Sequence, residues 1–284
     1  MILEKLFSTV SEFRKYAPSA ESNITFQDLN PSAAAAKKQI AVILTRDVYE
    51  LISQEEGDLK NALRTALANL TLGKQLIFDV ISRRKSDIDI YKHEQETMRR
   101  AYIDNYYTAM DTIIQLLEED KDPPIEWKNS RYCKLLASLR IRNTEHFDIL
   151  YPIDLSYLFF FRTTSIQKEV LEEGLTAYYD RAESRDDIIA MLDRCVAKKT
   201  ISIALKRFDI IEFPATIRNL FDDSKTMRNG TQEQERVLQV SSMLADEVRQ
   251  QLEEIDLMLT SNDSGSVVTE TSFNRPDDKI YLMA

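Results

Sequence analysis

The chain has 284 residues, of which 43% are hydrophobic and 30% are charged, and its formal net charge is −10 at pH 7. This length accommodates one large domain or two of moderate size. The acidic balance argues against a general nucleic-acid-binding protein. The presence of only five glycines favours helices, because glycine costs about 1 kcal/mol in a helix interior.

The sequence shows no membrane span and no secretory signal. Its most apolar stretch, residues 157–161, is far shorter than the roughly 20 residues that a spanning helix needs. The first residues lack the basic start and the long apolar centre of a signal peptide. We therefore expect a soluble chain that folds in a cytoplasm, with Cys133 and Cys195 as reduced, packed residues.

Apolar residues at three- and four-residue intervals predict a mainly helical chain. Two short extended segments are expected, at Ile24-Thr25-Phe26 and at residues 147–152. Ser32 is the expected capping residue of a long helix. In chain order, the expected helices span residues 1–17, 30–53, 58 to a break at 83–86, 90–119, 132–139, 166–181, 187–208 and 232–259.

Residues 49–99 and 178–228 resemble each other at a constant offset of 129, with eleven of 51 positions identical and no gap. Both copies are expected to consist of a helix, a break and a second helix. Residues 83–86 interrupt the first copy, and Pro214, which disfavours a helix interior, interrupts the second. The fold is therefore predicted to be mainly α, with two tandemly duplicated helical-bundle units.

The chain ends in a segment of different composition. Ser261-Asn262-Asp263-Ser264-Gly265 has linker chemistry, and an apolar tip follows at Ile280, Tyr281, Leu282 and Met283. An arm that docks on a neighbouring subunit is one interpretation, and a tail folded onto its own bundle is the other. The predicted organisation is an N-terminal helix and extended segment (1–31), helical repeat 1 (32–121), a connector (122–164), helical repeat 2 (165–260) and a C-terminal arm (261–284).

The residue types that carry catalytic chemistry are sparse. The glycines are too scattered for a phosphate-binding loop. His93 and His146 are the only histidines, and a zinc site would need both of them to converge with both cysteines. The carboxylate clusters are interpreted as solvated helix faces. We therefore predict no catalytic residue, no metal and no cofactor.

A small basic patch is predicted at Arg83, Arg84 and Lys85, with Arg99-Arg100 nearby. It is a candidate contact with phosphate or with a partner, and ordinary surface charge is the alternative. The second copy has Glu212-Phe213-Pro214 at the matching positions, so the patch is not part of the shared scaffold.

Two segments carry a resemblance to a known family. They are Ala35-Ala36-Lys37-Lys38-Gln39-Ile40, continuing through Leu44 to Tyr49-Glu50-Leu51, and the helix from Ala62 to Ile81. They resemble helical proteins that are encoded among the virion structural genes of Bacteroides phages and prophages. In plan the chain is also similar to the head–tail connector (adaptor) proteins of tailed phages. In those proteins a small helical bundle stacks under the portal as a ring, and a C-terminal arm enters a neighbour.

The resemblance covers residues 32–260 and implies a non-enzymatic subunit of a ring-shaped homo-oligomer. It implies the portal protein and other neck or tail proteins as partners, and transient contact with DNA in a channel. The implied location is the virion, after assembly in the host cytoplasm. The duplication departs from the single-bundle adaptors, which leaves the symmetry of the ring open.

Two other hypotheses remain at this point. One is an intracellular helical module or scaffold for protein–protein interaction, which the neighbouring genes would distinguish from a virion protein. The other is an enzyme with a site concealed on the bundle, which would require a pocket with strongly shifted carboxylates.

Overall fold

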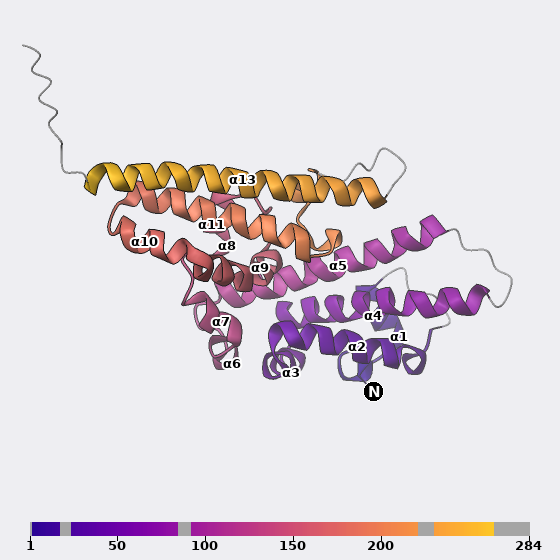
Figure 1. The fold of residues 1–284 in the computed structure, drawn as a ribbon. Coiled ribbons are helices and arrows are strands. Elements are labelled where there is room, and N and C mark those ends of the chain that lie inside the picture. Colours follow the sequence, from indigo (N-terminus) through magenta and orange to yellow (C-terminus); the bar gives the residue numbers. More distant parts are fainter. Residues whose placement is uncertain (1, 18–23, 85–91, 221–229, 264–284) are drawn as a thin grey trace, which may run out of the picture.

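The computed structural model describes residues 2–17, 24–84, 92–220 and 230–263 (Figure 1). Every regular element in these ranges is helical, and none of them contains a strand. This confirms the prediction of a mainly α fold. Most of the predicted C-terminal arm, including its tip at residues 280–283, lies outside the described residues.

Two groups of helices lie one above the other in Figure 1 and are joined where α5 packs against α9. The first group is η1 (Leu3–Lys5), α1 (Val10–Tyr16), α2 (Phe26–Leu44), α3 (Arg46–Gln54), α4 (Asp58–Arg84), α5 (Lys92–Glu119), α6 (Ile125–Lys128) and α7 (Arg131–Leu136). The second group is α8 (Thr144–Leu150), α9 (Tyr157–Val170), the π-helical turn η2 (Leu171–Leu175), α10 (Thr176–Ala182), α11 (Asp186–Arg207), η3 (Ile210–Glu212), α12 (Ala215–Arg218) and α13 (Gly230–Asp263).

Each group encloses its own hydrophobic core. The first core runs through α1 to α5, and Phe7 and Phe13 close one end of it with ring centroids 5.2 Å apart. The second core surrounds α11, which packs against α9 on one side and α13 on the other. Two packed cores in one chain agree with the size expected from its length.

The N-terminal elements differ from the prediction. The single helix over residues 1–17 is wrong, because α1 starts only after Thr9, whose Oγ1 accepts a hydrogen bond from the Glu12 amide at 3.1 Å. The strand at Ile24-Thr25-Phe26 and the helix start near Ser32 are also wrong. Thr25 caps α2 by accepting from the Asp28 amide, so the helix begins at Phe26 and contains Pro31.

Residues 147–152 are not extended, and α9 starts earlier than expected. The Asn143 side chain caps α8 by accepting from the His146 amide at 2.7 Å. The Asp148 carboxylate then accepts from the amides of Ile153 and Leu155, which satisfies the turn that leads into α9. These side-chain contacts compete with extended structure and select helix and turn.

Both long helices that were predicted to be continuous, at 30–53 and 166–181, break at corresponding positions. Thr45, between α2 and α3, has φ 74°, and Gly174, between α9 and α10, has φ 136°. These residues are separated by the offset of 129 found in the sequence. A positive φ ends a right-handed helix, and glycine adopts it far more readily than threonine does.

Residues that are 129 positions apart in the two copies are also buried alike. Leu63 and Leu192 are fully buried on α4 and α11, and so are Thr71 and Thr200. The helices α2–α3–α4–α5 and α9–α10–α11–α13 also occur in the same order, and α4 and α11 run in the same direction in Figure 1. A duplication would produce such correspondences, and the duplication itself stays a prediction.

Gly73 allows α4 to approach α5 closely. A Cβ atom at this position would lie 3.3 Å from Ile103 Cδ1 and 3.6 Å from Tyr102 Cβ. At the equivalent position in α11, the small side chain of Ser202 donates a hydrogen bond to the Ser241 carbonyl of α13 at 2.8 Å. A small residue therefore lies at the contact of α4 with α5 and at the contact of α11 with α13.

We expect Gly73→Leu to lower the free energy of unfolding by about 1–3 kcal/mol, because the larger side chain forces α4 and α5 apart. Gly73→Ala is the matched control. Its tight contact is offset by the higher helix propensity of alanine, so it should be close to neutral. Urea unfolding followed by circular dichroism measures both values, and an equal loss for the two variants would contradict a steric limit at this position.

Candidate interaction groove at the junction of the two units

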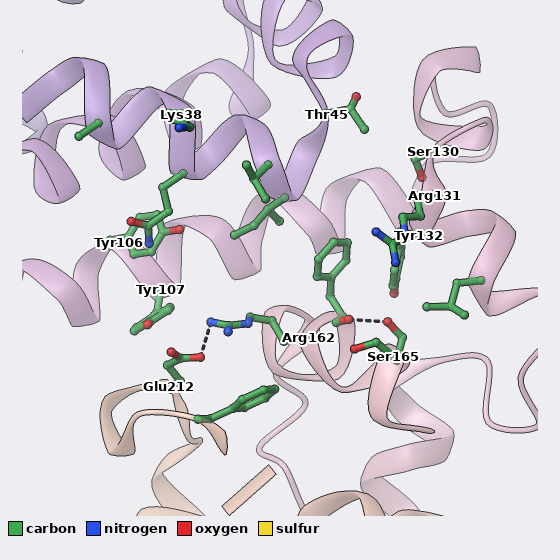
Figure 2. Close-up of a pocket in the computed structure, with 18 residues that line it drawn as sticks. Lys38, Thr45, Tyr106, Tyr107, Ser130, Arg131, Tyr132, Arg162, Ser165 and Glu212 are labelled. Atoms are coloured by element: carbon green, nitrogen blue, oxygen red, sulfur yellow. Dashed lines mark hydrogen bonds and ion pairs between the residues drawn. The ribbon is translucent and has the colours of Figure 1, made fainter. Parts of the chain in front are cut away.

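A cavity of about 820 Å³ lies where the two groups of helices meet (Figure 2). We call it the junction groove. Five elements supply its lining: α2, α5, α7, α9 and η3, together with residues next to them in the chain. The lining residues are Ala35, Lys38, Gln39, Val42, Ile43, Thr45, Tyr106, Tyr107, Ser130, Arg131, Tyr132, Leu135, Phe161, Arg162, Thr164, Ser165, Phe208 and Glu212.

Aromatic and aliphatic side chains form much of the groove surface. Tyr132 of α7 packs against Phe161 of α9, with ring centroids 4.3 Å apart, and against the buried Trp127 at 5.5 Å. Val42 of α2 is 76% exposed on the same lining. A mainly apolar, open groove of this size is typical of a binding site for a small molecule or a peptide segment.

An ion pair between two elements of the second group lies in the groove. The Arg162 guanidinium of α9 pairs with the Glu212 carboxylate of η3, as Figure 2 shows, and lies over the Phe208 ring at 4.8 Å. Burial raises the pKa of Glu212, and the charge of Arg162 opposes that shift. Burial also raises the pKa of Tyr107, and the charge of Glu212 adds to this, so the tyrosine stays neutral and can act as a hydrogen-bonding wall residue.

A second hollow of about 430 Å³ adjoins the groove. The two hollows share Tyr107, Arg162, Phe208 and Glu212. Arg218 of α12 pairs with Asp104 of α5 across the second hollow at 3.5 Å. A polar contact between α5 and the second group therefore lines the second hollow.

Asp111 of α5 helps to fix the position of α9. Its Oδ1 atom accepts hydrogen bonds from the Ser156 hydroxyl at 2.7 Å and from the Leu158 amide at 2.9 Å. Burial raises its pKa, and these hydrogen bonds oppose the shift. A carboxylate of the first unit thus satisfies the N-terminal amides of a helix in the second unit.

We expect Asp111→Ala to lower the free energy of unfolding by about 1–2 kcal/mol, as for the loss of other helix caps. Asp111→Asn keeps an acceptor oxygen and should recover most of the loss. Thermal unfolding at pH 7 compares the variants with the unchanged protein. If Asp111→Asn were as unstable as Asp111→Ala, the capping role would be wrong.

A buried carboxyl group lies behind the groove. The Tyr132 hydroxyl donates to Glu118 Oε1 at 2.5 Å. Burial raises the pKa of Glu118 to about 7, and the charges of Glu145 and Asp111 act in the same direction. Tyr157 donates to Glu145 at 2.7 Å, so two tyrosines connect these acids to the junction. The protonation of Glu118 is therefore linked to the position of a groove residue.

The residues singled out in the sequence do not meet at this groove. Arg83 and Arg84 belong to the end of α4, but their side chains, and all of Lys85, lie outside the described residues. Arg99 is exposed and lines another hollow of about 260 Å³, which shares Gln39, Tyr107 and Glu212 with the groove. Ile280, Tyr281, Leu282 and Met283 also lie outside the described residues.

Arg162 and Glu212 were not predicted as site residues. Each has one signal in the sequence: Arg162 follows the apolar run at 157–161, and Glu212 stands at the break before Pro214. Neither signal indicates that the two residues meet.

The described residues offer little for metal or thiol chemistry. No group of three or more His, Cys, Asp or Glu side chains among them is arranged to hold a metal ion. Cys133 and Cys195 are free, and burial raises the pKa of Cys195 to about 12. In the same part of the chain, no helix has the length and apolar composition to span a membrane.

The fold and the groove thus define a mainly α protein with two helical units around a shared junction groove. No protein-family model matches the chain, and neither a curated protein nor a solved structure matches it.

Proposed function

We propose that the chain is a non-enzymatic virion structural protein, a subunit of the head–tail connector or neck ring below the portal of a tailed phage. The junction groove is the observation that carries the proposal, since it offers an apolar cleft with charged groups at its edge to a partner segment. Such a combination is typical of protein interfaces. The resemblance stated above supplies the virion context.

The polar groups of the groove are better suited to binding a partner than to catalysis. Arg162 and Glu212 neutralise each other, and burial raises the pKa of Tyr106 to about 12, which keeps its hydroxyl group protonated. A general acid or base works best when its pKa lies near the working pH. The pKa of Glu118 is about 7, but this residue does not line the groove. It is half-buried and accepts a hydrogen bond from Tyr132.

A ring subunit must present two different surfaces, one to each neighbour. Two similar helical units in one chain provide such a pair of surfaces. The net charge of −10 suits a subunit that lines a DNA channel, because an acidic wall does not hold the phosphates and lets DNA slide. The proposed partners are copies of the same chain, the portal protein and other neck or tail proteins.

The proposal is tested on purified particles of the phage or prophage that encodes the chain. We expect mass spectrometry to find the chain in intact particles, and a particle reconstruction to place it as a ring below the portal. A chain that is expressed with the particles but is absent from them would contradict the proposal.

An intracellular helical interaction module is the second candidate. It is favoured by exposed apolar side chains away from the groove, Phe78 (57% exposed) on α4 and Met98 (43%) on α5. Both residues lie near the helix ends that flank residues 85–91. Neighbouring genes for a portal and a major capsid protein would favour the virion protein, and their absence would favour the module.

A further inference from the structure

We propose that the junction groove of one copy receives residues 277–283 of a second copy. In this arrangement Asp277 and Asp278 meet the cations at the groove edge, and Ile280 to Met283 cover its aromatic surface. The inference rests on the proposed homo-oligomer and assigns the contact that holds it together.

The groove is cationic, although the chain as a whole is acidic. Lys38, Arg131 and Arg162 line it, and Glu212 is its one anion. Lys38 and Arg131 are exposed, and neither has an ion-pair partner within the described ranges of the chain. Two unpaired cations beside an apolar surface select a segment that combines carboxylates with apolar side chains.

The uncharged part of the groove suits large apolar side chains. Tyr132 and Phe161 form an aromatic pair on one wall, and Phe208 lies below the Arg162 guanidinium on another. Val42 contributes an aliphatic surface that is 76% exposed. Tyr132 is already buried, so the surface that an apolar occupant would remove from water is that of Val42 and of the half-buried Phe161 and Phe208.

The C-terminal segment has the matching chemistry in the matching order. Asp277 and Asp278 are followed, after Lys279, by Ile280-Tyr281-Leu282-Met283. The acids and the four apolar residues are close enough in sequence to meet the cations and the aromatic walls of one groove together, because an extended residue spans about 3.3–3.6 Å.

The distance along α11 favours a second copy over the same chain. Arg185, just before α11, donates to the Met258 carbonyl near the end of α13, whereas Phe208 of the groove follows the last residue of α11. The 22 residues of α11 span about 33 Å. Thirteen residues separate the end of α13 from Asp277, and a flexible chain of that length would span about 20 Å on average. In Figure 1 the last described residues of α13 lie at the left end of the upper layer.

Photocrosslinking of the full chain tests the assignment. A photoreactive phenylalanine analogue replaces Tyr281, and equal amounts of unlabelled and ¹⁵N-labelled chains are mixed, irradiated and mapped by mass spectrometry. We expect crosslinks to groove residues such as Phe161 and Phe208, with mixed light–heavy pairs. The same analogue at Thr271 is the control and should give few crosslinks to the groove.

Charge reversal makes the test specific. The double variant Lys38→Glu with Arg131→Glu should reduce the groove crosslinks about tenfold, which corresponds to the loss of one close charge contact. Adding Asp277→Lys and Asp278→Lys to the same chain should restore them. Circular dichroism checks that the variants are folded, and Lys38→Gln with Arg131→Gln replaces the reversal if they are not.

The outcomes separate this inference from the proposed function. Crosslinks confined to pairs within one chain would overturn docking by a second copy. A homo-oligomer whose crosslinks fall outside the groove would overturn the groove assignment and leave the ring proposal standing. A monomeric chain would overturn both.

Discussion

Leu192→Ala is expected to lower the free energy of unfolding by about 2–5 kcal/mol, and Leu63→Ala by a similar amount. Both leucines are fully buried, Leu192 in the core around α11 and Leu63 in the core of the first unit. Each substitution removes apolar surface and leaves a cavity that neighbouring helices fill only partly. Urea unfolding followed by circular dichroism gives the two values.

Leu257→Ala is the matched control, because Leu257 is 73% exposed on α13 and its loss should change stability by no more than about 0.5 kcal/mol. A small effect at either buried leucine would show that its unit lacks a core of its own. Large, similar effects at both would be expected of two equivalent positions in duplicated units.

Glu118→Gln is expected to stabilise the protein at pH 8 by up to about 3 kcal/mol, with solvent screening reducing the value. The folded-state pKa of about 7 lies above the ordinary value of 4.5 for a glutamate. The folded state therefore holds this proton between about pH 4.5 and 7 while the unfolded state has lost it. Stability from this group is fully present below the unfolded pKa and is lost as the pH rises through the folded pKa.

The glutamine variant has no charge to bury, so the fall in stability between about pH 5 and 7 should become shallower. Glu119→Gln changes the next residue of α5, which is exposed, and serves as the control for a general change in net charge. Urea unfolding at a series of pH values compares both variants with the unchanged protein. If Glu118→Gln did not alter the pH dependence of stability, Glu118 would not be a buried group with a raised pKa.

The sequence predicts the long helices well and their interruptions poorly. The helices that start near Asp58 and Asp187 follow from regular apolar spacing, and the structure has them at Asp58–Arg84 and Asp186–Arg207. The break at Thr45 could not be predicted, because threonine rarely adopts a positive φ. Gly174 carried a recognisable signal for the equivalent break, and the aligned copies could have transferred it to Thr45.

The groove could not be predicted, because its residues come from five elements that are distant in sequence. Arg162 and Glu212 are separated by α10 and α11 and meet only when α9 packs beside η3. Periodicity identifies which face of a helix is buried, but it does not identify the partner of that face. The predicted basic patch and arm tip remain predictions, since their side chains lie outside the described residues.

Native mass spectrometry of the full chain tests the central claim most directly, namely that the two helical units build a contact surface between copies. The account predicts a discrete homo-oligomer at micromolar concentration. It also predicts that Lys38→Glu with Arg131→Glu shifts the oligomer toward monomer, and that Asp277→Lys with Asp278→Lys in the same chain restores it. A chain that stays monomeric over this concentration range would contradict the claim.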